Sequence, residues 1–233
     1  MAPQISVVLP VLNEETRIAD QLADLTARTD LSEIVVVDGG SDDRTAEIVR
    51  GFATVRLLAG PRGRGTQMNR GAEVATGDVF LFLHADVRLP SDAGRRIRDS
   101  LADPGVVGGA FRTRTVPDAE ARWPRLLAPL LRLADLRSRF TSIPYGDQAL
   151  FVRADVFRKA GGFPEIPIME DVELSRRLRR LGRLDRVPAV VTVSGRRFLA
   201  RPIYSALMMR SLPWLFRLGV PPSFLARLYG QPR

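Results

Sequence analysis

The sequence predicts an α/β protein with a mostly parallel central sheet flanked by helices. Short, nearly continuous apolar runs alternate with amphipathic segments in the first half of the chain, which is typical of strands buried on both faces and followed by covering helices. The chain has 233 residues, of which 45% are hydrophobic, so it can bury a substantial core. We assign residues 1–198 to one domain and residues 199–233 to an amphipathic helical extension at the C-terminus.

The first half repeats a unit of strand, loop and helix. Strands are predicted where β-branched runs end at proline, glycine or acidic residues: 5–9, 33–37, 55–58 and 79–83. Helices are predicted over residues 14–27, 43–52 and 66–75. In the first of these helices, Ile18, Leu22 and Leu25 fall on one face, as expected for a helix packed on a sheet.

The second half has a mixed pattern. Helices are predicted over residues 91–101, 156–160 and 171–181, the last two ending at glycines. Strands are predicted over residues 106–113 and 146–152. A basic amphipathic stretch covers residues 122–140, and the chain beyond residue 198 is apolar, rich in arginine and interrupted by prolines.

Composition narrows the chemistry. The formal charge is +9, from 35 basic and 26 acidic residues, and it favours anionic ligands. No nucleic-acid recognition motif and no basic face interleaved with stacking aromatics is present, so we expect no nucleic-acid partner. With no cysteine in the chain, a bound metal must be held by oxygen ligands or by His84, the single histidine, and oxygen ligation indicates Mg²⁺ or Mn²⁺.

The N-terminus has no basic segment followed by a long apolar core, and no window reaches the roughly 18 apolar residues of a membrane span. We therefore expect a cytoplasmic location. The amphipathic C-terminal extension leaves open an association with the inner face of the cell membrane.

An apolar run over residues 79–83 stops abruptly at His84, Ala85 and Asp86. Sites in open α/β sheets lie at the carboxyl ends of the strands, so Asp86 is a candidate ligand of a metal or phosphate. The alternative is an ordinary polar turn. Asp38 ends the second predicted strand in the same way, before Gly39 and Gly40, and can accept hydrogen bonds from a base or ribose.

Capping explains part of these loops equally well. Ser41 or Asp42 can cap the helix that follows, and Asn13 is better explained as a cap than as a ligand. The segment PRGRGTQMNRG at residues 61–71 opens the third helix, where Arg64, Gln67 and free backbone amides can surround a diphosphate.

Eight segments now form an ordered series along the chain. They are PVLNEE (10–15), VDGGSDDRT (37–45), residues 65–77, HAD (84–86), YGDQ (145–148), GGF (161–163), MEDVEL (169–174) and SGRRF (194–198). This series resembles the successive motifs of family 2 glycosyltransferases of the GT-A fold. Within that family the chain most resembles a compact bacterial subgroup often labelled carotenoid-type glycosyltransferases.

The resemblance implies an inverting, metal-dependent transfer of sugar from a nucleotide-diphosphate sugar, with UDP favoured, to a hydroxyl acceptor. It implies that Asp86 holds Mn²⁺ or Mg²⁺ and that Asp171 is the catalytic base. His84 stands where many members have an aspartate, and Phe198 where tryptophan is commoner. The implied donor-binding residues are Pro10, Asn13, Glu14, Asp38, Gly40, Arg64, Gln67, His84, Ala85 and Arg197. The implied acceptor-binding residues are Gly146, Asp147, Gln148 and Glu170.

The basic amphipathic segments leave three interpretations open. They can contact an anionic membrane, which suits a lipid-linked acceptor; they can pack on the core with their arginine stems folded over it; or they can form a homodimer interface. Two rival functions also stay open. One is a sugar-phosphate nucleotidyltransferase, although its glycine-rich loop is missing after the first strand, and the other is a noncatalytic anion-binding or membrane-docking protein on the same fold.

Overall fold

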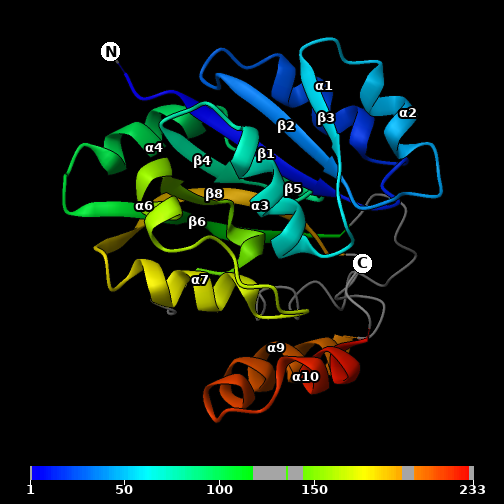
Figure 1. Ribbon diagram of the computed structural model, residues 1–233, viewed down its shortest axis with the longest axis vertical. Coiled ribbons are helices and arrows are strands. Elements are labelled where there is room, and N and C mark those ends of the chain that lie inside the picture. The colour runs from blue at the N-terminus through cyan, green and yellow to red at the C-terminus, as the bar shows by residue number, and fades with distance from the viewer. Residues whose placement is uncertain (1, 118–134, 136–143, 196–201, 231–233) are drawn as a thin grey trace.

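In the computed structural model, which describes residues 2–117, 135, 144–195 and 202–230, the chain is organised around an eight-stranded sheet (Figure 1). The strand order is β3-β2-β1-β4-β7-β6-β8-β5. The strands are β1 (Ile5–Val11), β2 (Glu33–Asp38), β3 (Val55–Ala59), β4 (Val79–Phe82), β5 (Val87–Arg88), β6 (Val106–Val116), β7 (Leu150–Arg153) and β8 (Arg183–Ser194).

The parallel half of the sheet consists of β3, β2, β1 and β4. Its carboxyl ends are aligned, since Val11 of β1 is paired with Asp38 of β2. The other half is mixed, because β7 runs antiparallel to both β4 and β6, whereas β6 and β8 are parallel. The sheet is therefore mixed overall, and the predicted α/β class with flanking helices is confirmed.

Helices cover both faces of the sheet. Residues of α1 (Ile18–Thr26), α2 (Thr45–Arg50) and α4 (Ala93–Leu101) belong to one core cluster, with Leu81 and Phe151. Residues of α3 (Arg64–Val74), α6 (Ala154–Lys159) and α7 (Glu170–Leu178) belong to the other. Successive side chains of β4 belong alternately to the two core clusters, because side chains alternate between the two faces of a strand.

Four phenylalanines form the centre of the second core cluster: Phe80, Phe82, Phe157 and Phe163. The rings of Phe82 and Phe163 meet edge to face with centroids 4.8 Å apart, and those of Phe80 and Phe157 with centroids 5.6 Å apart. Edge-to-face pairs of this kind add about 0.5–1.5 kcal/mol beyond area burial. This cluster fixes β4 against α6 and the loop before α7, and the segments that follow β4 and that loop supply His84, Asp86 and Asp171 to the candidate site.

Several predicted boundaries need correction. Residues 146–148, predicted as part of a strand, form a single 3-10 turn, and the strand β7 begins at Leu150. β5 and β8 were not predicted, although β8 is the longest strand in the described part of the chain. The predicted segment at residues 122–140 falls, except for Asp135, outside the described residues, as do Arg197 and Phe198.

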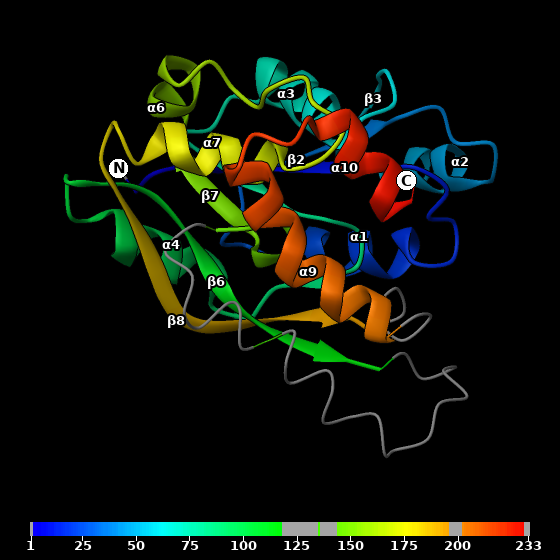
Figure 2. The same cartoon turned by 90° about the horizontal axis from the view of Figure 1, so that it is seen from below.

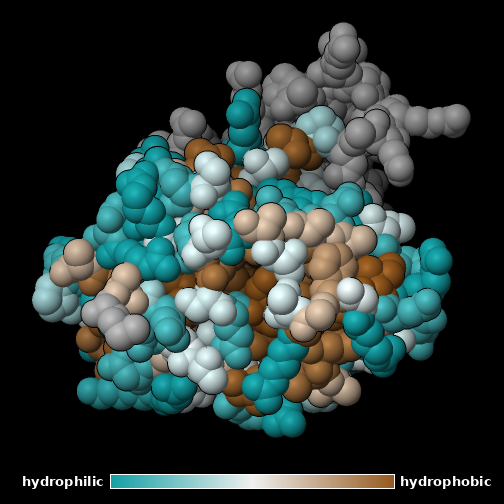
Figure 3. All heavy atoms as spheres, turned by 90° about the horizontal axis from the view of Figure 1, so that it is seen from above, coloured by the Kyte–Doolittle hydropathy of each residue, from teal (hydrophilic) through white to brown (hydrophobic). Residues whose placement is uncertain are grey.

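The C-terminal part forms α9 (Pro202–Arg217) and α10 (Pro222–Tyr229), which lie together beneath the sheet domain in Figure 1 and in front of it in Figure 2. Leu212 and Leu225 pack with Ile168, so the two helices are joined to the loop before α7. Figure 3 shows the side turned away from them, where hydrophilic residues form most of the rim and apolar residues show near the centre. No helix among the described residues is long and apolar enough to cross a bilayer.

Candidate active site

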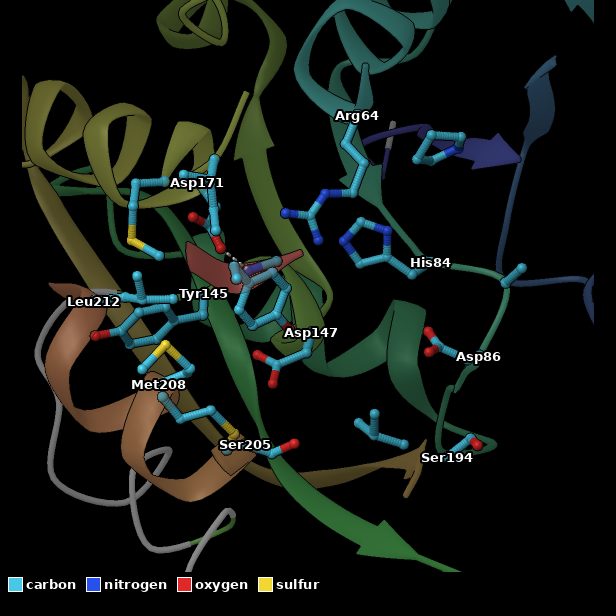
Figure 4. Close-up of a pocket in the computed structure, with 18 of the residues that line it drawn as sticks. Arg64, His84, Asp86, Tyr145, Asp147, Asp171, Ser194, Ser205, Met208 and Leu212 are labelled. Carbon is cyan, nitrogen blue, oxygen red and sulfur yellow. Dashed lines mark hydrogen bonds between the residues drawn. The ribbon is translucent and has the colours of Figure 1, made fainter. Parts of the chain in front are cut away.

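A pocket of roughly 220 Å³ lies where the carboxyl ends of β1 and β4 face α7 and α9 (Figure 4). Ten residues of the predicted site line it: Pro10, Glu14, Arg64, Gln67, His84, Ala85, Asp86, Gly146, Asp147 and Asp171. Five residues of the predicted site do not line it: Asn13, Asp38, Gly40, Gln148 and Glu170. The remaining predicted residue, Arg197, lies outside the described residues.

Gln67 holds two strand ends together at one side of the pocket. Its buried amide nitrogen donates to the carbonyl oxygens of Val11, at 2.9 Å, and Val37, at 2.8 Å. A buried amide that donates to two main chains fixes their relative position, because breaking either hydrogen bond would leave a buried polar group unsatisfied. Gln67 thereby positions the loop after β1, and it also lines the pocket itself.

Asp38 lies one strand away from the pocket, paired with Val11, which does line it. Its carboxylate accepts hydrogen bonds from the Ser41 hydroxyl, at 2.5 Å, and the Ser41 backbone amide, at 3.1 Å. Ser41 therefore holds Asp38 and does not cap α2. The carboxylate that accepts from the Thr45 amide near the start of α2 is Asp43, at 2.9 Å.

The prediction that Asn13 caps the first helix is wrong. Its side-chain oxygen accepts from the Asp42 amide, at 2.9 Å, and its own amide donates to the Ser41 hydroxyl, at 3.0 Å. These bonds tie the loop after β1 to the loop after β2. Asn13 has a φ of 54°, a conformation that asparagine tolerates better than most residues, and such strain gathers at functional loops.

His84, Ala85 and Asp86 form the corner between β4 and β5. The corner is closed by hydrogen bonds from the Val87 amide to the His84 carbonyl, at 3.1 Å, and from the Ser194 amide to the Asp86 carbonyl, at 3.1 Å. This backbone anchoring leaves the half-buried Asp86 side chain to line the pocket. Figure 4 shows its carboxylate well separated from that of Asp171, with His84 between them in the view.

Asp86 can serve a metal only together with a ligand. Within the described residues no group of three or more histidines and acids could hold a metal by itself. Sites for Mg²⁺ and Mn²⁺ at phosphates use one or two carboxylates and take their other ligands from the phosphates and water. The donor set therefore fits a metal shared with a bound diphosphate.

Asp171 lies in the first turn of α7. Its Oδ2 accepts a hydrogen bond from the Gly146 amide at 2.6 Å, and its Oδ1 accepts one from the Val172 amide at 2.7 Å. Met169, just before the helix, has a φ of 69°, and this left-handed residue turns the chain into α7. A carboxylate oxygen can accept more than one hydrogen bond, so Asp171 can still accept a hydrogen bond from a group bound in the pocket.

Gly146 brings Asp171 and His84 close to each other. A Cβ at position 146 would lie 2.8 Å from Nε2 of His84 and 3.4 Å from Oδ2 of Asp171. Only glycine allows this approach without displacing the imidazole. The 3-10 turn at Gly146–Gln148 thus links the corner after β4 to the start of α7.

Glu170 lies beneath the pocket and holds Arg64 in it. The carboxylate is 3% exposed, with Oε1 3.0 Å from Nε of Arg64 and Oε2 buried without a hydrogen-bond partner. Burial raises the pKa of Glu170 to about 7, against the opposing effect of Arg64 and with a further increase from Asp171. Burial also works to lower the pKa of Arg64, but the acidic groups around it outweigh burial and raise that pKa. These groups are Glu170, Asp171, Tyr229 and Asp86.

Gln148 does not join Gly146 and Asp147 in the pocket. It lines a second cavity with Arg179, Asp185 and Arg186. Ala149, directly after Gln148, has a φ of 50° and turns the backbone from the 3-10 turn into β7. The assignment of Gln148 to the acceptor side therefore has no support from its position.

Comparison of the sequence with known protein families identifies the family of this chain. The family model described as "Glycosyl transferase family 2" matches residues 6–161. The chain belongs to glycosyl transferase family 2. The predicted family is thus confirmed.

Curated relatives of this family 2 chain include undecaprenyl-phosphate 4-deoxy-4-formamido-L-arabinose transferases. The protein of that name from Pseudomonas aeruginosa is 32% identical over 165 residues, 64% of this chain and 46% of the relative. That from Aeromonas hydrophila is 34% identical over 122 residues, 47% of this chain and 37% of the relative. The matched part thus spans less than half the length of these relatives.

Solved structures show the same fold. A mannosyltransferase from Pyrobaculum calidifontis in complex with GDP-Man and Mn²⁺ has a TM-score of 0.64 at 22% identity, over 91% of this chain and 65% of the other. S. aureus TarS 1-349 in complex with UDP-GlcNAc has a TM-score of 0.60 at 19% identity, over 91% and 66% of the two chains. The GT-A fold predicted for this family 2 member is confirmed.

Sequence reasoning missed one wall of the pocket. The missed wall residues come from α9, α10 and the ends of β6 and β8: Thr115, Val193, Ser194, Ser205, Met208, Met209, Leu212, Pro213 and Tyr229. The spacing of Ser205, Met208 and Leu212 at three and four residues places them on one helical face, and this was the available signal. Because α9 completes the pocket, the predicted boundary at residue 198 would separate parts of one site.

Proposed function

We propose that this pocket binds a nucleotide-diphosphate sugar, with a UDP-sugar favoured, and transfers the sugar with inversion to an acceptor hydroxyl. The observation that supports this most strongly is that one pocket is lined by the cation Arg64, the carboxylate Asp86 and, from a different element, the carboxylate Asp171. A group-transfer site needs a charge-stabilising side for the leaving group and a proton-accepting side for the nucleophile.

The donor diphosphate lies, in this proposal, between Arg64 and Asp86. Arg64 opens α3, whose first-turn amides favour anions, and Glu170 orients its guanidinium from below. Asp86 holds the divalent metal, which when bound supplies positive charge against the leaving diphosphate. The solved structures with GDP-Man and Mn²⁺ and with UDP-GlcNAc support this ligand class.

Asp171 removes the proton of the acceptor hydroxyl. The Gly146 amide fixes the orientation of its carboxylate through the 2.6 Å hydrogen bond. Asp171 acts on the acceptor hydroxyl as a base, and no carboxylate is assigned as a nucleophile at the anomeric carbon. The proposal is therefore a single displacement, which inverts the anomeric configuration.

The acceptor side carries an apolar wall. Met208, Met209 and Leu212 of α9 line the pocket on the side of Tyr145. Such a wall favours an acceptor with an apolar chain over a free sugar. The names of the curated relatives, which contain undecaprenyl-phosphate, support a lipid-linked acceptor.

A lipid phosphate is the second candidate acceptor, and the same names favour it. Its oxygen is already ionised at neutral pH, so transfer to it needs no general base. The two candidates differ in what they require of Asp171, and its replacement separates them.

The donor proposal is tested by thermal unfolding with UDP, GDP and their sugar conjugates, with and without Mn²⁺. A ligand at about 100 times its dissociation constant stabilises the native state by about 2.7 kcal/mol, which raises the melting temperature of a chain of this size by about 5–10 °C. We expect Asp86→Ala to abolish the Mn²⁺-dependent part, while Asp155→Ala, an exposed acid on α6, retains it. The proposed function would be contradicted if the melting temperature stayed unchanged with every nucleotide, both with and without Mn²⁺.

A further inference from the structure

Helix α9 has two apolar faces. One lines the pocket through Met208, Met209 and Leu212, the last of which is 1% exposed. The other points to solvent: Leu207 is 58% exposed, Trp214 65% and Leu218, just past the helix, 72%. With about 100° of turn per residue, these three exposed residues fall within roughly 40° of one another, nearly opposite Leu212. The exposed stripe is thus a second surface, distinct from the pocket wall.

Helix α10 carries two further exposed apolar side chains. Phe224 and Leu228, four residues apart and therefore on one helical face, are 48% and 38% exposed. The Tyr204 hydroxyl donates to the Leu228 carbonyl and joins the start of α9 to the end of α10. We call the five side chains of Leu207, Trp214, Leu218, Phe224 and Leu228 the outer face. Apolar residues grouped in this way on a surface mark an interaction site more often than isolated ones do.

The charges on these helices are all of one sign. Arg210, Arg217 and Arg227 are exposed on α9 and α10, and residues 202–229 contain no aspartate or glutamate. Arg210 and Arg217 follow Leu207 and Trp214 by three residues and so flank the apolar stripe. This combination of bulky apolar side chains and arginines without acids is the pattern of a helix that lies in the interface of an anionic bilayer.

We propose that the outer face docks on an anionic lipid bilayer, with α9 and α10 lying in the headgroup region and the pocket on the protein side of α9. This proposal extends the proposed function, because it names the surface through which the protein reaches a lipid-linked acceptor. The docking itself is independent of the proposed function, and only the lipid-linked acceptor rests on it. A second copy of the chain is less favoured as the occupant, because a two-fold interface would bring the same arginines of both copies together without acids to neutralise them.

Flotation with lipid vesicles tests the docking. The probes are vesicles of phosphatidylcholine alone and of phosphatidylcholine with phosphatidylglycerol. We expect binding to the anionic vesicles that weakens with salt. Each arginine near an anionic surface contributes about a fivefold change in partitioning, so Arg210→Gln with Arg217→Gln should weaken binding about 25-fold. The matched control is Arg50→Gln with Arg180→Gln, two exposed arginines on α2 and just after α7, which should bind as the wild type does.

The apolar part is tested by Trp214→Ser with Leu218→Ser. We expect at least a tenfold loss of vesicle binding, with unchanged thermal shifts by UDP and Mn²⁺, since neither residue lines the pocket. Val190→Ser, at a residue of β8 that is 43% exposed, is the control for loss of an exposed apolar side chain. In a Trp123→Phe background Trp214 is the single tryptophan, so its emission should shift to the blue on anionic vesicles and be quenched by lipids brominated near the headgroup.

Three results would overturn the docking proposal. They are the absence of flotation with anionic vesicles, equal binding of the wild type and the Trp214→Ser, Leu218→Ser variant, and a dimer in solution that this variant dissociates while vesicles bind neither protein. Failure of the proposed function would look different, because vesicle binding would persist while every nucleotide leaves the melting temperature unchanged.

Discussion

The buried Glu170 should make the stability of the protein depend on pH in a predictable direction. Its pKa is raised from 4.5 to about 7 in the folded protein, mainly by burial. A carboxyl group that holds its proton more tightly when folded contributes stability that is complete below its unfolded pKa. That contribution is lost as the pH rises through the folded pKa. At about 1.36 kcal/mol per pH unit, the loss is on the order of 3 kcal/mol between about pH 5 and 8.

Glu170→Gln removes this titration while keeping an oxygen that can accept from Arg64. The free energy of unfolding of the wild type, measured with urea, should therefore fall relative to that of the variant as the pH rises from 5 to 8. Glu165→Gln, at an exposed glutamate in the loop before α7, is the control and should follow the wild type. A difference between wild type and Glu170→Gln that stays constant with pH would refute the reasoning.

Three further substitutions test the architecture of the site. Gly146→Ala places a Cβ 2.8 Å from Nε2 of His84. We expect the rate of UDP release from a saturating UDP-sugar to fall at least tenfold while the melting temperature changes little. An unchanged rate would show that the close approach of Gly146 to His84 is dispensable. Gly71→Ala places a Cβ 2.4 Å from Cγ1 of Val8; overpacking should lower the free energy of unfolding by about 1–3 kcal/mol, and an unaltered urea midpoint would count against this packing. Arg64→Gln should raise the KM for the donor at least tenfold with a smaller effect on kcat, and the reverse pattern would place Arg64 at another step.

In the parallel half of the fold β3 is only partly buried, but β1, β2 and β4 were readable from the sequence because each is an apolar run buried on both faces. Residues 183–194 gave no such signal. In β8 buried and exposed residues alternate, and Pro188 interrupts the run. Pro188 is tolerated because it falls in a register shift, where Phe111 pairs with Val187 and Arg112 with Val190. Proline at an irregularity of this kind costs no hydrogen bond between the strands, so β8 forms although proline is normally unfavourable within a strand.

The family motifs placed Asp86 after a strand and Asp171 at the start of a helix, and the structure brings both side chains to one pocket; their roles stay predictions. Short-range reasoning failed where a side chain bonds across loops. Asn13 was expected to cap the following helix, but its partner lies 29 residues away, at Asp42. Glu170 was assigned to the acceptor, but it is buried under Arg64. The wall from α9 depends on how the extension folds back, which local sequence cannot specify.

Replacement of Asp171 tests the central claim most directly. Asp171→Asn keeps an oxygen that can accept from the Gly146 amide, so the UDP-sugar should raise the melting temperature of the variant as it does that of the wild type. With water or a polyprenol as hydroxyl acceptor, UDP release should fall by about 10²–10⁴-fold, the usual contribution of a general base. Donor binding retained with this loss of rate is the predicted result, and release to a hydroxyl acceptor at the wild-type rate would contradict the account.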